Sequence, residues 1–337
     1  NKKDIDRKLT TLSRVIQRTH IPILDCILIE VNNDVKLTTS NNEMSVTTHI
    51  NNANIESKGC VAVEAKSLSD AIRMLPNDDI SFTETETSLN VVHSKGEFEL
   101  PLYNPQDYPI IKGVDSDVYV VDSKLIRDAI PHMGDDELRP ILNGVYLDFE
   151  NGAVVASNKN SMIMQSITPS SGSVLIPRST AYFIKDMDNE VVVKFKDGMV
   201  SLIAGDYEVI SKTIEGRYPN YNMIIPKNHL KATFNKEELI DAIKRVSIFS
   251  NINKMIEFDI NEYGTTLYVK NNNFGTSAKE SVSSSGDSIE INFQSELMQS
   301  VLNSCDNEEI VMEFSSPSIA MLIKECNKTL LLMPMIA

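Results

Sequence analysis

The stretch Phe234-Asn235-Lys236-Glu237-Glu238-Leu239-Ile240, followed by Ala242, Ile243 and Val246, is the third copy of a pattern that decides the fold. The second copy is Val121-Asp122-Ser123-Lys124-Leu125-Ile126 with Ala129 and Ile130, and the first is Ile5-Asp6-Arg7-Lys8-Leu9 with Leu12, Val15 and Ile16. Each copy has an apolar strand-end residue, an Asp or Asn that can cap a helix, and an apolar stripe at helical spacing. The copies start 116 and 113 residues apart, which is a domain length rather than a solenoid repeat. The chain is predicted to contain one domain three times.

A second sequence pattern recurs with the same spacing and lies roughly midway through each repeat. Short apolar strands at 61–66, 174–179 and 289–294 each run into an amphipathic helix, the last of them expected over 294–304. Alternating segments such as 34–39, 191–195, 265–269 and 309–314 are typical of antiparallel strands. We therefore expect an α+β fold with two helices against antiparallel sheet in each domain. The expected domains are 1–115, 116–229 and 230–337, because Tyr103–Pro109 and Gly216–Tyr221 place a Pro after an aromatic residue, which suits an extended exit.

Composition places limits on compartment and cofactors. No apolar run is long enough to cross a bilayer, and the first residues do not lead into a signal-peptide core, so a cytoplasmic location is expected. The four cysteines (Cys26, Cys60, Cys305 and Cys326) lack metal-type spacing and are expected to be free thiols in the core. The sequence predicts no metal and no cofactor.

Charge initially argues against a nucleic-acid partner. The chain has 47 acidic and 32 basic residues, for a formal net charge of −15, whereas phosphate binding relies on Lys and Arg. Net charge misleads, however, when basic residues gather on one surface. The predicted helices carry such residues, although an ordinary solvated helix face would carry them too, and the helix at 294–304 has none. The basic candidates are Lys8, Arg14, Arg18, Lys66, Arg73, Lys124, Arg127, Arg178, Lys185, Lys236, Lys244 and Arg245.

Catalytic motifs are missing. The chain has no Gly-rich phosphate loop, no His-Glu-x-x-His, no Cys-x-x-Cys and no Gly-x-Ser-x-Gly. Its five histidines are scattered, and the pairs Asp78-Asp79 and Asp186/Asp188 are interpreted as turns and caps rather than as an acid–base pair. The sequence therefore favours a protein that is not an enzyme, while a composite active site between domains stays open.

The C-terminal stretch, Leu330-Leu331-Leu332-Met333-Pro334-Met335-Ile336-Ala337, is apolar, whereas chain ends are normally polar and frayed. Together with the threefold repeat, this ending resembles the bacterial DNA polymerase III beta subunit, the beta sliding clamp family. Other segments are similar to that family in the same order along the chain. They are Arg18–Leu24, Arg139–Val145, Ile176-Pro177-Arg178, and Glu215-Gly216-Arg217-Tyr218-Pro219-Asn220-Tyr221 with Ile225-Pro226.

The resemblance implies three tandem DNA-clamp domains, with two chains joined head to tail as a six-domain ring around duplex DNA. It implies a processivity factor that tethers the replicative DNA polymerase, the clamp loader and other clamp-binding proteins, and that performs no catalysis. The basic helix residues named above would face DNA, and the acidic residues would lie on the outside of the ring. Contacts with phosphates would be weak and independent of sequence, which permits sliding.

The resemblance also implies a partner-peptide pocket. The matching positions are Leu142, Ser157, Met162, Pro219, Met223, Ile224, Gln294, Leu297, Leu331, Leu332, Met333, Pro334 and Met335. One segment departs from the family, because Ser157-Asn158-Lys159-Asn160-Ser161-Met162 stands where the family usually has Thr-Asp-Gly-His-Arg-Leu. The preferred peptide is therefore expected to differ from the usual Gln-Leu-x-Leu-Phe type.

For the subunit interface, the resemblance implies Phe98 and Leu100 of the first domain and Ile248 and Phe249 of the third. Phe98-Glu99-Leu100 alternates like an edge strand, whose backbone another chain could pair with. Two other interpretations stay open. A structural or adhesion protein of repeated domains would explain the acidity but not the basic helices or the apolar end, and an enzyme has no motif in its favour.

Overall fold

The computed structural model describes residues 2–16, 21–51, 53–187, 190–250, 252–271 and 274–336. Contacts between residues divide the chain into two compact units. Unit 1 comprises residues 1–124 and 179–213, and unit 2 comprises residues 125–178 and 214–337. The described residues contain six α-helices, two in each sequence repeat. They are α1 (Lys2–Leu12), α2 (Ala65–Met74), α3 (Ser123–Ala129), α4 (Arg178–Ile184), α5 (Lys236–Ser247) and α6 (Ser295–Asn303).

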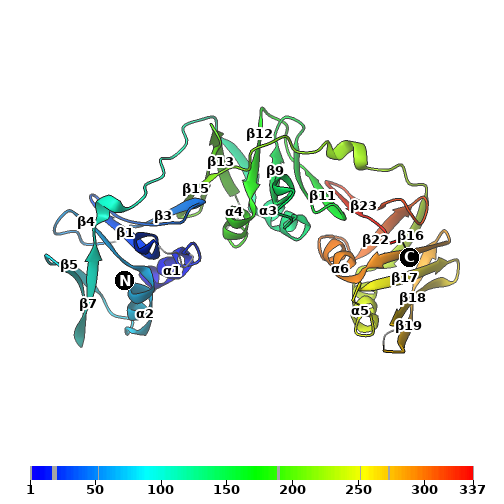
Figure 1. The fold of residues 1–337 in the computed structure, drawn as a ribbon, viewed down its shortest axis with the longest axis horizontal. Coiled ribbons are helices and arrows are strands. Elements are labelled where there is room, and N and C mark those ends of the chain that lie inside the picture. The colour runs from blue at the N-terminus through cyan, green and yellow to red at the C-terminus, as the bar shows by residue number, and fades with distance from the viewer. Residues whose placement is uncertain are drawn as a thin grey trace. The chain divides into compact units, whose positions relative to one another are not determined.

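Unit 1 contains an 11-stranded antiparallel sheet in the order β5-β6-β7-β4-β1-β2-β3-β15-β14-β13-β8. The ladder between β3 and β15, with Val46 opposite Val209, joins strands of the first and second repeats. Helices α1 and α2 pack beside each other (Figure 1). The strands are β1 (Cys26–Val31), β2 (Val35–Ser40), β3 (Met44–Ile50), β4 (Gly59–Glu64), β5 (Ser81–Glu84), β6 (Ser88–His93), β7 (Gly96–Tyr103), β8 (Tyr119–Asp122), β13 (Glu190–Lys196), β14 (Met199–Ala204) and β15 (Tyr207–Lys212).

Unit 2 contains a 9-stranded sheet, β12-β9-β10-β11-β24-β23-β22-β16-β20, and a 4-stranded sheet, β19-β18-β17-β21. Here β11 pairs with β24, so strands of the second and third repeats share one sheet. Helix α5 packs on α6 and covers β18 and β19. The strands are β9 (Gly144–Asp148), β10 (Ala153–Ser157), β11 (Ser161–Ser166), β12 (Ser173–Pro177), β16 (Leu230–Asn235), β17 (Met255–Asn261), β18 (Gly264–Asn271), β19 (Thr276–Val282), β20 (Ser284–Gly286), β21 (Ile289–Gln294), β22 (Glu309–Phe314), β23 (Met321–Glu325) and β24 (Lys328–Leu332).

Helix α5 shows why the repeated pattern folds as predicted. The Asn235 side chain accepts a hydrogen bond from the Glu238 backbone N–H at 3.0 Å, which satisfies one of the unpaired donors of the first turn. Two acidic residues lie in the first turn and two basic residues in the last, in favourable positions for the helix dipole. In the second copy, Asp122 accepts from the Lys124 N–H at 2.8 Å. The predicted helix starts are therefore confirmed for the second and third copies.

The first copy was interpreted wrongly at its start. Ile5 and Asp6 both lie inside α1, which already runs from Lys2, so Ile5 is no strand end and Asp6 is no cap. The Asp6 carboxylate instead accepts a hydrogen bond from the Lys2 ammonium one turn earlier, at 2.7 Å. An apolar residue followed by Asp is thus compatible both with a helix cap and with an i,i+4 ion pair inside a helix.

The cysteine prediction is correct in part. All four cysteines are free, and Cys26 and Cys305 are buried, with burial as the main cause that raises the pKa of each thiol to about 12. Cys60 and Cys326, however, are exposed, so the prediction of core thiols is wrong for them. Cys60 lies near the start of β4, opposite Glu30, and the next three residues of the strand are buried.

Two further features bear on the expectations. None of the helices in the described ranges is long and apolar enough to cross a membrane. The two compact units do not coincide with the three repeats, because sheet pairing crosses from one repeat to the next within each unit. Domain boundaries near residues 115 and 229 therefore stay a prediction.

Candidate functional site

The apolar C-terminal stretch is held in place by its backbone in unit 2. Strand β24 lies between β11 and β23, with Leu331 opposite Met162 on one side and Leu322 on the other. Beyond the strand, the Met333 N–H donates to the Asn160 carbonyl at 2.7 Å, and the Met335 N–H donates to the Asn292 carbonyl at 2.8 Å. The tail is thus tied at Asn160 to the β10–β11 turn and at Asn292 to β21.

The predicted pocket residues divide by burial. Leu142, Met162 and Leu331 belong to one buried apolar cluster of unit 2, and Ser157 and Leu332 are buried as well. Met223 is 81% exposed and Met333 39% exposed. We call the accessible members of the set the tail surface. It comprises the exposed Pro219, Met223, Ile224 and Met333 and the half-buried Gln294, Leu297, Pro334 and Met335.

The segment Gly216–Tyr221 contributes Tyr218 and Tyr221 to the buried cluster, and these two tyrosines fix it in place. The Tyr218 ring stacks on Tyr146 with centroids 4.5 Å apart, and the Tyr221 hydroxyl donates to the Asp148 carboxylate at 2.8 Å. Burial raises the pKa of both Tyr218 and Tyr221. Gly216 has φ +127°, which disfavours residues with a side chain. This geometry gives a structural reason for the Gly-Arg-Tyr-Pro-Asn-Tyr motif.

The divergent segment Ser157–Met162 forms a tight turn between β10 and β11. The Asn158 side chain accepts hydrogen bonds from the backbone N–H of Asn160 at 3.1 Å and of Ser161 at 2.8 Å. Lys159 has φ +79°, a conformation that favours glycine, and its ammonium bonds the Asp136 carboxylate. Asn158 therefore supplies the turn-stabilising oxygen, and an ion pair accompanies the strained backbone of Lys159.

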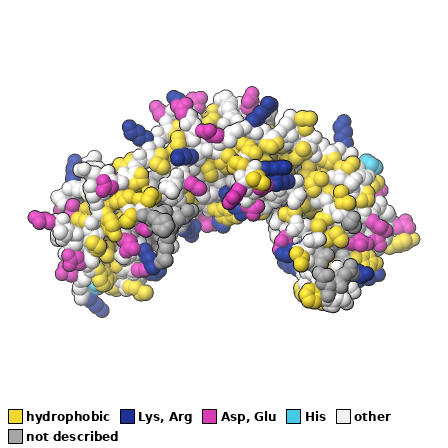
Figure 2. Space-filling model, in the orientation of Figure 1, with side chains coloured by type: hydrophobic (Ala, Val, Ile, Leu, Met, Phe, Trp, Pro, Cys, Tyr) yellow, Lys and Arg dark blue, Asp and Glu magenta, His cyan; other side chains and the backbone are white. Residues whose placement is uncertain are grey.

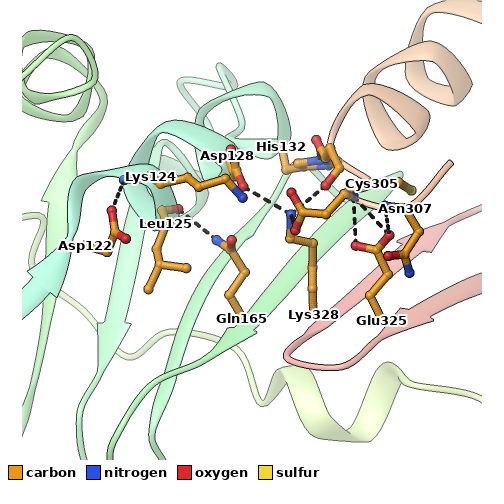
Figure 3. A network of polar contacts seen from close by, with 12 residues as sticks. Asp122, Lys124, Leu125, Asp128, His132, Gln165, Cys305, Asn307, Glu325 and Lys328 are labelled. Carbon is orange, nitrogen blue, oxygen red and sulfur yellow. Dashed lines mark hydrogen bonds and ion pairs between the residues drawn. The ribbon is translucent and has the colours of Figure 1, made fainter. Parts of the chain in front are cut away.

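A buried polar network lies beside this turn, and the sequence interpretation had not singled it out (Figure 3). The two ring nitrogens of His132 lie 3.1 Å from the hydroxyls of Ser161 and Ser304. Lys328 is 3% exposed, and its ammonium contacts Asp306 at 2.9 Å, Asp128 at 3.1 Å and the Ser304 carbonyl at 2.6 Å. Burial, with a smaller contribution from Lys328, lowers the pKa of His132 to about 4. The only sign of this network in the sequence is Lys328, a Lys at the start of an apolar strand.

The basic candidates also divide. Arg14, Lys66, Arg73, Lys124, Arg127, Lys244 and Arg245 are exposed. Several are paired with carboxylates, as Arg14 is with Asp186 at 3.1 Å and Arg245 is with Glu280. In the view of Figure 2, Lys and Arg side chains are interspersed with Asp and Glu.

Four basic candidates are not supported as phosphate ligands. The prediction that Lys8 faces DNA is wrong, because the residue is only 2% exposed. Its ammonium donates to the His49 carbonyl and lies 3.4 Å from Asp206. Lys236 and Arg178 are half-buried and donate to the carbonyls of Cys305 and Gly134, both at 3.0 Å. The ammonium of the half-buried Lys185 sits 5.1 Å from the centroid of the Tyr182 ring. A long cation on a helix can thus serve the fold rather than a ligand.

Two sequence-predicted positions, Arg18 and Asp188, lie outside the described residues. Among the residues that the structure does describe, no group of three or more His, Cys, Asp or Glu side chains is placed to hold a metal ion.

The predicted interface residues lie in both units. Ile248 is 77% and Phe249 43% exposed at the end of α5, and Phe98 is 39% exposed on β7, while Leu100 is buried. Along β7, residues 96–101 pair with β6, but the ladder to β4 begins only at Leu102. Within the described residues, the stretch that carries Phe98 thus has a backbone partner on one side.

Comparison with known proteins gives a consistent result along the whole chain. Three family models match in order: the N-terminal domain of the DNA polymerase III beta subunit over residues 1–112, its central domain over 121–220 and its C-terminal domain over 222–335. Proteins named beta sliding clamp from Staphylococcus aureus and Staphylococcus epidermidis are 27% and 25% identical to this chain, and each match covers 90% of this chain and 88% of the relative.

Solved structures agree on the fold. The chain is similar to a putative DNA polymerase III beta subunit from Eubacterium rectale, with a TM-score of 0.91 and 23% identity. It is similar as well to a sliding clamp from Bartonella birtlesii bound to griselimycin, with a TM-score of 0.92 and 23% identity. Each match covers 100% of this chain and 98% of the other. The architecture is therefore three clamp domains of helices and antiparallel sheet.

Proposed function

Because the chain belongs to the DNA polymerase III beta subunit family, the beta sliding clamps, we propose that it is a processivity factor that encircles duplex DNA and tethers a DNA polymerase. The observation that carries this proposal is the order and coverage of the three domain matches, which leave only short segments of the chain unmatched. The function is not catalytic. Membership in this family argues against both alternative interpretations, an adhesion protein of repeated domains and an enzyme with a composite active site.

The proposed ring consists of two copies joined head to tail, and each copy contributes three domains with boundaries near residues 115 and 229. The exposed cations Arg14, Lys66, Arg73, Lys124, Arg127, Lys244 and Arg245 are the candidates to face phosphates. Several of them are paired with carboxylates, which favours weak contacts, as a protein that slides requires. A bacterial replication clamp of this kind would work in the cytoplasm.

The tail surface is the proposed binding site for polymerase, loader and other clamp-binding proteins. Its methionines are flexible and polarisable, and such side chains adapt to different apolar peptides. The tail is tied by two backbone hydrogen bonds, so Met333 and Met335 are presented on an ordered segment rather than on a frayed end. A buried cluster with Leu142, Met162 and Leu331 supports the surface from below.

The divergent turn bears on which peptides bind. Asn160 and Ser161 are uncharged where the family usually has His and Arg, and the Lys159 ammonium is tied to Asp136. We expect the polymerase peptide of this system to depend on apolar anchors rather than on charge at this end of the site.

The test is peptide binding by fluorescence anisotropy, with a clamp-binding peptide of the cognate polymerase. The variant Met333→Ala/Pro334→Ala should weaken binding by at least about tenfold, since buried anchors in such sites carry about 2 kcal/mol or more. Met74→Ala, which removes an 82% exposed methionine from unit 1, is the matched control and should bind as the wild type does. Equal affinity of the tail variant and the control would refute the assignment of the tail surface.

A further inference from the structure

Strands β11 and β24 pair with each other and present two different faces. In their antiparallel register Met162 lies opposite Leu331, and both belong to the buried apolar cluster beneath the tail surface. Ser161, Gln165 and Lys328 alternate with these residues and therefore lie on the other face, where the buried polar network is found (Figure 3). The tail surface and the polar network thus lie on opposite faces of one ladder.

Lys328 fastens the first residue of β24 to two helices. Its ammonium lies 3.1 Å from the Asp128 carboxylate of α3, and it donates to the carbonyl of Ser304, the residue that ends α6, at 2.6 Å. Beside it on β11, the Gln165 side chain donates to the Leu125 carbonyl of α3 at 2.8 Å. A buried ammonium is costly without such partners, so these contacts determine where β24 begins.

His132 fastens the other end of the same strand through the β10–β11 turn. Its Nδ1 lies 3.1 Å from the hydroxyl of Ser161, which follows Asn160, and the Asn160 carbonyl accepts the Met333 N–H at 2.7 Å. Its Nε2 lies 3.1 Å from the hydroxyl of Ser304. A neutral imidazole has one donor and one acceptor nitrogen, so it can bridge two hydroxyls without a charge. Both ends of β24 are therefore connected to the end of α6 through Ser304.

We propose that this network positions the partner site from the opposite face of the ladder. Lys328 and His132 are positioning residues that fix the two ends of β24, and with them the methionines of the tail. The inference rests on the proposed partner site and adds residues that a bound peptide does not touch, because His132 is 0% and Lys328 3% exposed. A tail that is already ordered spares the bound peptide the cost of ordering it.

The composition of β24 explains why polar contacts are needed there. The strand continues after Lys328 as Thr329-Leu330-Leu331-Leu332, and three consecutive leucines do not define which of them faces the cluster. A slip by one residue would move every side chain to the other face of the sheet. It would also take Lys328 away from Asp128 and the Ser304 carbonyl, which leaves a buried cation without partners. The network therefore selects the register that places Leu331 in the cluster.

The test compares tail order and peptide binding in full-length variants at pH 7, where the buried His132 ring is neutral. With methionine labelled at its nitrogen, NMR reads hydrogen exchange at the Met333 amide and at Met312 of β22, a central strand of the same sheet. His132→Leu keeps the bulk and loses both hydrogen bonds. It should accelerate exchange at Met333 relative to Met312 by at least about fivefold, which corresponds to the loss of one hydrogen bond.

The same variant should weaken the clamp-binding peptide of the cognate polymerase by at least about fivefold. His132→Gln, which can bond both serines, should restore the exchange rate and the affinity. Ser161→Ala removes the hydroxyl on the turn side, carries the same expectation and replaces His132→Leu if that variant does not fold. Thr265→Val is the matched control, because it removes a buried hydroxyl of unit 2 that bonds Ser284; it should change neither readout.

The inference is overturned if Met333 exchanges no faster than in the wild type, or if Met312 accelerates as much as Met333. It is also overturned if His132→Gln behaves as His132→Leu does, or if faster exchange leaves the peptide affinity unchanged. A wild-type protein that does not bind the peptide would instead overturn the proposed partner site, and the inference with it.

Discussion

His132 should make the stability of this protein fall steeply in mild acid. Its ring is buried between Ser161 and Ser304, and burial lowers its pKa from the ordinary 6.5 to about 4. The unfolded chain therefore binds a proton between these two values that the folded chain does not bind. Stability contributed by the neutral ring is fully present above pH 6.5 and is lost as the pH falls towards 4. At 1.36 kcal/mol per pKa unit, the loss is about 2 kcal/mol between pH 7 and pH 5.

The assay is urea unfolding at pH 7 and pH 5, followed by far-UV circular dichroism because the chain has no tryptophan. His132→Gln keeps a polar side chain that can bond both serines but does not titrate in this range. The difference in unfolding free energy between wild type and this variant should change by about 2 kcal/mol between the two pH values. His229→Gln, at an exposed position of unit 2, is the control and should show no such change. An identical pH slope for wild type and His132→Gln would refute the reasoning.

Two other predictions concern charges. Lys328→Met should destabilise the protein by about 3–5 kcal/mol in urea unfolding, because it removes a buried ammonium that contacts Asp128 and the Ser304 carbonyl. Lys324→Met, at a 48% exposed lysine on the neighbouring strand, should cost less than about 1 kcal/mol; similar losses for both would contradict the account. Lys66→Gln/Arg127→Gln should reduce the slope of log binding constant against log salt on duplex DNA by about 2 per chain, while an unchanged slope would remove both residues from the DNA-facing set.

The repeat and its helices could be predicted from sequence because local signals suffice for them. Asn235 and the apolar stripe after it determine where α5 starts and which side is buried, without reference to distant residues. Asp6 fits the same pattern but lies inside α1, because the role of a single carboxylate depends on where the helix began. Local patterns therefore predicted which elements form more reliably than they predicted where each one starts.

The residues of the candidate site could be predicted only from the resemblance to the beta sliding clamp family. The members of the buried cluster under the tail, such as Leu142 and Met162, come from distant segments that periodicity cannot bring together. Burial of Lys8 and Lys328 depends on acceptors contributed by other elements, among them the His49 and Ser304 carbonyls, and nothing at either lysine signals it. The tail is fixed by the carbonyls of Asn160 and Asn292, and a backbone acceptor leaves no trace in the sequence.

The central claim is that the protein holds DNA by encircling it. The most direct measurement is retention on a nicked circular plasmid, onto which the cognate clamp loader has placed the protein, at high salt, by gel filtration, before and after one restriction enzyme linearises the plasmid. High salt removes phosphate contacts, so only topology retains the protein. We predict that the protein co-elutes with the circle and is lost once the DNA has ends. Equal retention on circular and linear DNA, or none on either, would contradict the claim.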